Sequence, residues 1–194
     1  MVVRNKPEPD SNNLMSNSLF IANQDKYLSE RTGKYEYRAI RYRLAADELI
    51  RMGLNDTHTV LDLGAGWTEF DYCLRVEYNW RGRYIPLDGS INGEDLNTWH
   101  PPREYDFFVG LELLEHLVSP EHLVTAIKEK TLIGGVVSVP DPEKFDIMSI
   151  DDTHVTEVTS ALLNEWDFAT QSVQLYGGIH TAGGNDGLIG VWEK

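Results

Sequence analysis

Short apolar runs alternate along the chain with segments in which apolar residues recur every three or four positions. The first pattern predicts buried strands, and the second predicts helices that bury one face. Strands are predicted at residues 57–63, 83–88, 105–110, 134–139, 168–175 and 188–192. Helices are predicted at residues 39–53, 70–80, 119–130 and 156–166. Strand and helix therefore alternate from residue 58 to about residue 166, and two strands then follow without a helix between them.

This order predicts an α/β fold, a doubly wound and mostly parallel sheet with helices on both faces. The last two strands, joined by the glycine-rich segment 177–187, should form a C-terminal antiparallel hairpin at the sheet edge. Pro86 should place the strand at 83–88 at a sheet edge or at a strand end, because proline cannot donate to the ladder.

The same pattern predicts the domain organisation. Residues 1–18 are rich in Asn, Ser and Pro, which is typical of a flexible N-terminal arm. Residues 19–194 are enough for a single domain and too few for two of ordinary size. The segment 140–155 follows a predicted strand at the end where such folds bind substrate, so we interpret it as a substrate-side loop, either a lid or a packed connection.

Composition excludes several classes of protein. The chain carries 17 Lys and Arg against 31 Asp and Glu, a formal net charge of −14. Such a protein is not broadly attracted to phosphate backbones, so a nucleic acid partner is possible but not favoured. No apolar run is long enough to span a membrane, and the N-terminus lacks the apolar core of a signal peptide, so a cytoplasmic protein without membrane contact is expected. The single cysteine, Cys73, excludes an internal disulfide and is expected in the core.

A locally basic region precedes the first predicted strand. Its basic residues are Arg31, Lys34, Arg38, Arg41, Arg43 and Arg51. Acidic residues alternate with them, which is typical of a solvated helix face, and this is the interpretation we favour. A contact with a phosphate or a polyanion is the alternative.

The segment 60–66, Val-Leu-Asp-Leu-Gly-Ala-Gly, places a glycine-rich turn directly after a predicted strand. It resembles the first motif of class I S-adenosylmethionine-dependent methyltransferases, where small residues let the backbone pass beneath the cofactor. The resemblance implies S-adenosylmethionine as cofactor, with Asp62 facing its methionine end. Thr68 stands where a third glycine would be, which weakens the alternative of a dinucleotide site. The turn residues that would lie against the cofactor are Gly64, Ala65, Gly66 and Trp67.

Asp88 ends the next strand, about 20 residues beyond the turn, where an acidic residue would accept hydrogen bonds from both ribose hydroxyls. Asp95 and Leu96 resemble the pair that meets the adenine in this family. Too few residues separate Asp88 from Asp95 for the usual helix. The domain should therefore be shortened between its second and fourth strands, with the third strand vestigial, and the resemblance implies a cofactor-binding core at 58–140.

Residues 105–117 carry the most specific match after the glycine turn. They resemble the fourth motif and following helix of small methyltransferases that contain Leu-Glu-His-Leu, here at 114–117. The resemblance implies that Leu111 and Glu112 border the methyl donor. No Asp/Asn-Pro-Pro-aromatic run occurs, which disfavours methylation of amino groups on DNA bases, and Cys73 on a predicted helix disfavours a thiolate nucleophile.

Glu112, Glu115 and His116 are spaced to share one face of that helix. The run resembles the metal-binding Glu-x-x-Glu-His of small-RNA 3′-end 2′-O-methyltransferases and of ubiquinone-pathway O-methyltransferases. In the RNA enzymes a further histidine follows the next strand, as His154 does here. The resemblance implies a Mg or Mn ion held by these four residues, which would lower the pKa of the hydroxyl to be methylated. In metal-free relatives with the same run, His116 would instead be a general base.

The sequence therefore predicts an enzyme, an S-adenosylmethionine-dependent methyltransferase that acts on an oxygen or nitrogen of a small molecule or nucleoside. Glu112, His116 and His154 are its candidate catalytic residues. Two alternatives stay open: a metal-dependent 2′-O-methyltransferase acting on an RNA end, and a catalytically inactive cofactor-binding or interaction protein of the same fold. The sequence predicts neither the acceptor nor the oligomeric state.

Overall fold

The computed structural model describes residues 35–194. The predicted arm at 1–18 and the basic residues Arg31 and Lys34 lie outside the described residues. The strands are β1 (Thr59–Leu63), β2 (Arg83–Leu87), β3 (Tyr105–Leu111), β4 (Thr131–Pro140), β5 (Ala169–Val173) and β6 (Gly187–Glu193). The helices are α2 (Tyr35–Arg51), α3 (Glu69–Tyr72), α4 (Gly89–Asn92), α5 (Pro120–Lys130), α6 (Ile147–Ile150) and α7 (Ser160–Glu165). A π-helical turn, Cys73–Glu77, extends α3, and a 3-10 turn, Leu114–His116, follows β3.

The strands form one sheet in the order β2-β1-β3-β4-β6-β5. The first four strands in this order are parallel, and β6 is antiparallel to both β4 and β5. The predicted parallel sheet with a C-terminal antiparallel hairpin is therefore confirmed. Pro86 lies on β2, which is an edge strand, as expected of a residue that lacks an N–H.

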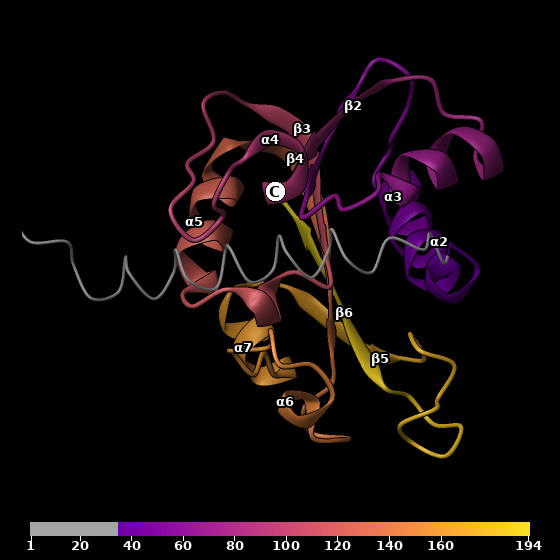
Figure 1. The fold of residues 1–194 in the computed structure, drawn as a ribbon. Helices are drawn as coiled ribbons and strands as arrows, with labels where there is room; N and C mark the ends of the chain where they lie inside the picture. The colour runs from indigo at the N-terminus through magenta and orange to yellow at the C-terminus, as the bar shows by residue number, and fades with distance from the viewer. Residues whose placement is uncertain (1–34) are drawn as a thin grey trace, which may run out of the picture.

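Helices cover both faces of the sheet, with α2 and α3 on one side and α5 and α7 on the other (Figure 1). Alternation along the central strands supplies a core to each side. Val60 and Phe107 pack with the helix α2, whereas Leu61 and Phe108 pack in the core that includes α5 and α7. Cys73 is fully buried beside α2, as predicted.

The strand order reverses between β1 and β3, because the chain passes from β1 to one side and returns to the other. In open α/β sheets, ligands bind in the crevice at the carboxyl ends of the strands at such a switch point. Between β2 and β3 the described chain forms only the single turn α4, with no strand at 93–104. The predicted shortening of the fold is therefore present.

Two predicted helices differ from those observed. The helix expected at 156–166 begins only at Ser160, because the Thr159 hydroxyl caps the backbone N–H of Leu162 at 3.1 Å. The helix expected at 70–80 consists of α3 and the π-helical turn and ends before Asn79, which has a left-handed φ of 55°.

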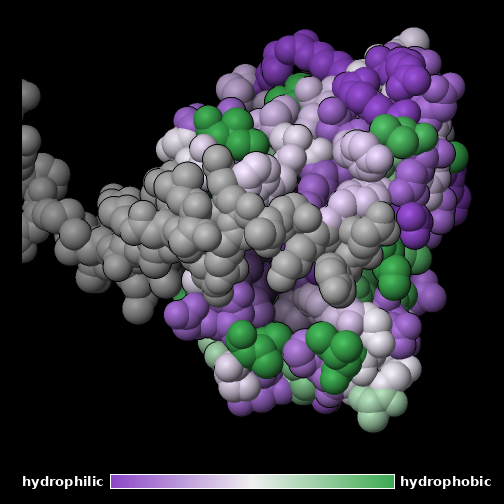
Figure 2. All heavy atoms as spheres, turned by 45° about the vertical axis from the view of Figure 1, so that its right-hand side comes forward, coloured by the Kyte–Doolittle hydropathy of each residue, from purple (hydrophilic) through white to green (hydrophobic). Residues whose placement is uncertain are grey.

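The face drawn in Figure 2 is mostly hydrophilic, with hydrophobic side chains in small separate groups. This distribution matches the acidic composition of the chain. Among the described helices, none combines the length and the apolar character that a membrane crossing requires.

Candidate functional site

A cavity of about 230 Å³ opens at the carboxyl ends of β1 and β3, at the switch point of the sheet. Its walls come from α2, from the glycine turn, from the turn after β3, and from the segments around residues 150–154 and 176. The lining residues include Arg38, Arg41, Tyr42, Asp62, Gly64, Ala65, Gly66, Trp67, Glu69, Leu111, Glu112, Glu115, His116, Asp151, His154 and Tyr176. The cavity therefore brings together most residues that the sequence analysis selected.

The glycine turn after β1 has the conformation that its sequence predicts. Gly64 and Gly66 have positive φ values of 70° and 47°, which favour glycine. A Cβ at Gly64 would also lie 3.0 Å from Cδ1 of Leu113. The backbone N–H groups of Gly64 and Ala65 donate to the carbonyl of Leu87 at 2.8 and 3.2 Å. This hydrogen bonding holds the turn against the end of β2.

Asp62, at the end of β1, is almost completely buried, and its carboxylate accepts a hydrogen bond from the hydroxyl of Tyr84. Burial raises the pKa of Asp62 to about 7, the hydrogen bond from Tyr84 opposes that rise, and the charge of Asp88 adds to it. The group therefore titrates near neutral pH, on the wall of the cavity.

Asp88, Asp95 and Leu96 do not line the cavity. The Asp88 carboxylate accepts from the backbone N–H of Gly66 at 3.0 Å and caps α4 through the N–H of Ser90 at 2.8 Å. Asp95 accepts from Asn97, and Leu96 packs in the core. The cavity is therefore lined by the residues predicted to contact the methionine end of the cofactor, but not by those predicted to contact its ribose and adenine.

Glu112 does not share a helical face with Glu115 and His116, because the chain after β3 forms a 3-10 turn in place of the expected helix. Glu112 itself has a left-handed φ of 55°, an uncommon conformation for a residue with a side chain. Its Oε1 accepts from the hydroxyl of Ser138 at 2.8 Å, and its Oε2 lies 3.8 Å from Nη1 of Arg41. Glu112 lines the cavity but is directed toward Arg41 and Ser138.

Glu115, His116 and His154 form a compact group whose ligand atoms lie within 4.8 Å of one another. Glu115 is 1% exposed, and neither of its carboxylate oxygens has a hydrogen-bond partner among the described residues. Burial, followed by the charge of Glu112, raises the pKa of Glu115 well above its ordinary value. Three of the four predicted metal ligands therefore converge, without Glu112.

Both histidines are oriented through Nδ1. Nδ1 of His116 lies 3.2 Å from the carbonyl and 3.0 Å from the hydroxyl of Thr153, which in turn donates to Asp151 at 2.6 Å. Nδ1 of His154 lies 2.7 Å from the carbonyl of Ile147. A carbonyl partner fixes the proton on Nδ1, so the lone pair of each ring is assigned to Nε2. On His116 that nitrogen lies 4.0 Å from Oε1 of Glu115.

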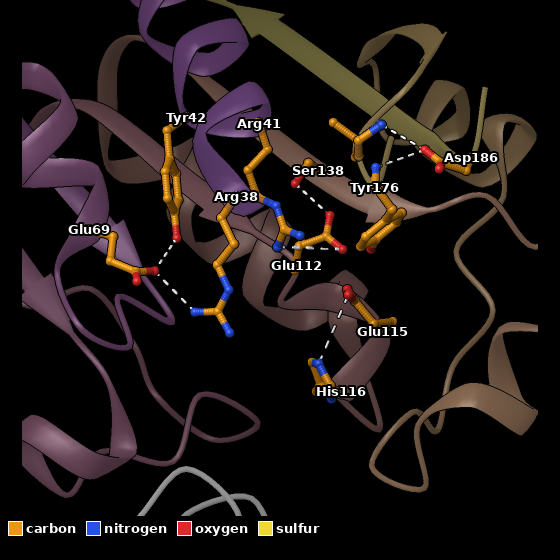
Figure 3. A network of polar contacts seen from close by, with 11 residues as sticks. Arg38, Arg41, Tyr42, Glu69, Glu112, Glu115, His116, Ser138, Tyr176 and Asp186 are labelled. Carbon is orange, nitrogen blue, oxygen red and sulfur yellow. Dashed lines mark hydrogen bonds and ion pairs between the residues drawn. The ribbon is translucent and has the colours of Figure 1, made fainter. Parts of the chain in front are cut away.

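The basic helix α2 contributes residues that the sequence analysis did not select. Arg38 and the hydroxyl of Tyr42 both bind Oε2 of Glu69, at 3.0 and 2.6 Å (Figure 3). Arg41 is 9% exposed and lines the cavity. The prediction of a wholly solvated face was therefore wrong for Arg41 and holds for the exposed Arg43. Spacing of three and four residues could have placed this group on one face.

Tyr176, in the loop between β5 and β6, was also missed. Its ring lies against Arg41, with the arginine Cζ 5.2 Å from the ring centroid. The fully buried carboxylate of Asp186 holds this loop by accepting from the N–H groups of Leu175, Tyr176 and Gly178, at 2.7, 3.0 and 2.7 Å. Figure 3 shows Asp186 bound to the backbone of Tyr176. The hairpin thereby supplies a fixed wall of the cavity.

No protein-family profile and no curated protein sequence matches the chain. Solved structures do match. One is a Haloferax volcanii complex of the Trm112 methyltransferase activator with a methyltransferase, at TM-score 0.65 and 16% identity over 91% of this chain and 96% of that one. Coclaurine N-methyltransferase bound to N-methylheliamine and SAH matches at TM-score 0.63 and 12% identity, over 98% and 90% of the two chains. The DhpI–SAH complex matches at 0.58 and 19%, over 91% and 95%. The chain has the class I methyltransferase fold.

Proposed function

We propose that the chain is an S-adenosylmethionine-dependent methyltransferase that acts on an oxygen or nitrogen of a small molecule or nucleoside. One observation carries the proposal: the glycine turn after β1 and the Glu115–His116 turn after β3 face one cavity at the switch point of the sheet. The similar structures with SAH bound support S-adenosylmethionine as the donor.

In this proposal the methionine end of the donor lies against the glycine turn, near Asp62 and Trp67. Asp88, Asp95 and Leu96 are proposed to meet the ribose and adenine, beyond the lining of the cavity. Asp88 also holds the backbone of Gly66, so it would link the ribose to the shape of the turn.

His116 is the proposed general base. Its Nε2 would take the proton from the acceptor's O–H or N–H as that atom attacks the sulfonium methyl in line. The bond from sulfur to the methyl carbon breaks, and S-adenosylhomocysteine (SAH) leaves with the electron pair on sulfur. The chain from Asp151 through Thr153 to Nδ1 of His116 would stabilise the positive charge that the imidazole gains. His154 would position the acceptor.

Calorimetric titration with SAH tests the donor assignment. The wild-type protein should bind SAH, and Gly64→Ala should weaken binding at least about tenfold, or about 1.4 kcal/mol, because the added Cβ distorts the turn. Gly93→Ala is the matched control: its φ of 73° gives similar backbone strain, but no atom lies within 4 Å of the added Cβ. Absence of SAH binding to the wild-type protein, or equal loss in both variants, contradicts the proposal.

The Glu115–His116–His154 group favours a second candidate, a metal-dependent O-methyltransferase. The residues fit a divalent ion: the two Glu115 oxygens lack partners among the described residues, and both imidazoles are held through Nδ1. Two imidazoles and one carboxylate suit Mn²⁺ better than Mg²⁺, which prefers oxygen ligands. A bound ion would supply Lewis acidity toward an acceptor hydroxyl.

Electron paramagnetic resonance of Mn²⁺ tests this candidate without any acceptor. If the group holds the ion, Glu115→Gln and His154→Ala should each abolish tight Mn²⁺ binding, because each removes one of three protein ligands. Glu121→Gln, at an exposed carboxylate on α5, is the matched control and should bind as wild type does. Equal Mn²⁺ binding by wild type and Glu115→Gln rejects the metal site and leaves His116 as the metal-free base.

A test of methyl transfer separates the proposed enzyme from the remaining alternative. A catalytically inactive cofactor-binding protein would bind SAH and transfer no methyl group to any acceptor. An acceptor screen that uses radioactive S-adenosylmethionine, with His116→Ala as the control, distinguishes it from the enzyme: the proposal expects a methylated product that the variant does not form.

A further inference from the structure

Arg41 has an incomplete set of contacts for a buried arginine. It is 9% exposed and lines the cavity. Its ion pair with Glu112 spans 3.8 Å, and its buried Nε has no hydrogen-bond partner in residues 35–194. A guanidinium has five N–H donors, and burying them without acceptors is unfavourable. Arg41 therefore lines the cavity while one of its donors, the buried Nε, has no acceptor in the described chain.

Two other arginines on α2 are paired closely. Nη1 of Arg38 lies 3.0 Å from Oε2 of Glu69, and Nε of Arg43 lies 2.6 Å from Oε2 of Glu77. The arginines before and after Arg41 on α2 therefore each have a short contact with a carboxylate. The missing contact is specific to the arginine that is most buried.

Arg41 contacts residues that follow β3 and β5, which lie on one side of β1 and its glycine turn in the order of the sheet. Its neighbours are Glu112, which follows β3, and Tyr176, which follows β5 (Figure 3). Arg38, by contrast, binds Glu69 at the start of α3, next to the glycine turn. The proposed donor occupies the turn side. Arg41 therefore borders the space that the acceptor would fill.

Building on the proposed function, we propose that Arg41 binds an oxyanion of the methyl acceptor, so that the substrate is a small molecule with a carboxylate or phosphate group. A planar guanidinium can donate two parallel hydrogen bonds to either group. Glu112, whose Oε2 lies 3.8 Å from Nη1 of Arg41, would compete with this oxyanion for the guanidinium.

The test uses full-length protein saturated with SAH and titrated with phenyl phosphate, with benzoate and with neutral phenol, followed by saturation-transfer NMR. At least one anion should bind to the wild-type protein, and phenol should not. Arg41→Met should weaken anion binding about tenfold, because the charge-assisted hydrogen bonds are lost. Glu112→Gln should tighten it about threefold, because a competing carboxylate is removed. Arg43→Met, exposed on the same helix, is the matched control and should bind as wild type does.

The proposal is overturned if no anion binds to the wild-type protein, if Arg41→Met binds anions as the wild type does, or if Glu112→Gln binds them more weakly. The donor's own carboxylate is the other possible oxyanion. If Arg41→Met loses affinity for SAH but keeps that for 5′-methylthioadenosine, which lacks the carboxylate, then Arg41 serves the donor and the proposal fails. If SAH does not bind the wild-type protein, the proposed function is contradicted instead. Anion titration of the protein without SAH then decides whether Arg41 binds an oxyanion.

Discussion

Asp62 is a buried titrating group that lines the cavity, so its protonation affects both the stability of the protein and the charge of the cavity wall. The fold buries this carboxyl group at the end of β1, where Tyr84 of the neighbouring strand donates a hydrogen bond to it. Burial raises its pKa to about 7. The unfolded chain would have an ordinary pKa of about 3.9 at this position. Between these two values the folded protein holds a proton that the unfolded chain releases.

Asp62→Asn should therefore remove part of the pH dependence of stability. Because the folded-state pKa is raised, the stabilising effect of the proton is fully present below about pH 4 and is lost as the pH rises toward about 7. Between about pH 5 and about pH 8, the free energy of unfolding of the wild-type protein should fall by about 2 kcal/mol more than that of the variant. Urea denaturation at both pH values measures this difference.

Asp167→Asn is the control for this prediction, because its side chain is 84% exposed. It should keep the pH dependence of the wild-type protein. Identical pH dependence in wild type and Asp62→Asn would show that the buried carboxyl group does not titrate in this range.

At the scale of elements, the loop between β5 and β6 depends on a single carboxylate. Asp186 is fully buried and accepts three backbone hydrogen bonds from the opposite side of the loop. The loop carries Tyr176 to Arg41 of α2, an element from the other end of the described chain. Hydrogen bonds from the backbone to this carboxylate therefore hold the part of the cavity wall that extends beyond the pairing of β5 with β6.

Asp186→Ala should loosen this wall. Three N–H groups would lose a charged acceptor, so we expect the free energy of unfolding to fall by about 3 kcal/mol. Amide hydrogen exchange should accelerate most at Leu175, Tyr176 and Gly178. Ile179→Ala, at an exposed side chain of the same loop, should leave exchange at these amides unchanged. Unchanged exchange in Asp186→Ala would contradict the role assigned to this carboxylate.

The sheet could be predicted from the sequence because its central strands are distinct apolar runs, and all six predicted strands are present. The glycine turn could be predicted because its backbone needs glycine at positive φ. The position of Arg41 could not, because helical spacing identifies a face but not the element that the face meets. The direction of Glu112 could not either, because its left-handed φ turns it away from the regular spacing assumed for a helix.

At the scale of the whole molecule, the net charge of −14 opposes broad contact with polyanions. Single-stranded RNA of about 20 nucleotides, at about 150 mM salt, should therefore show no binding tighter than a Kd of about 10 μM in fluorescence anisotropy. The same measurement at lower salt is the control, since weak nonspecific contacts would strengthen there. Tight binding that depends on the RNA end would favour the alternative of an RNA 2′-O-methyltransferase.

The position of β6 has a consequence for the order in which the molecule forms during synthesis. In the described sheet β5 pairs only with β6, and β6 lies between β4 and β5, although β5 is made first. Residues 59–140 are synthesised before residues 169–193, so the β1–β4 strands can pair and the glycine turn can close before β5 and β6 are available. Asp186, which fixes Tyr176, emerges only just before β6. The nascent chain therefore completes the glycine turn before it completes the cavity wall that carries Tyr176.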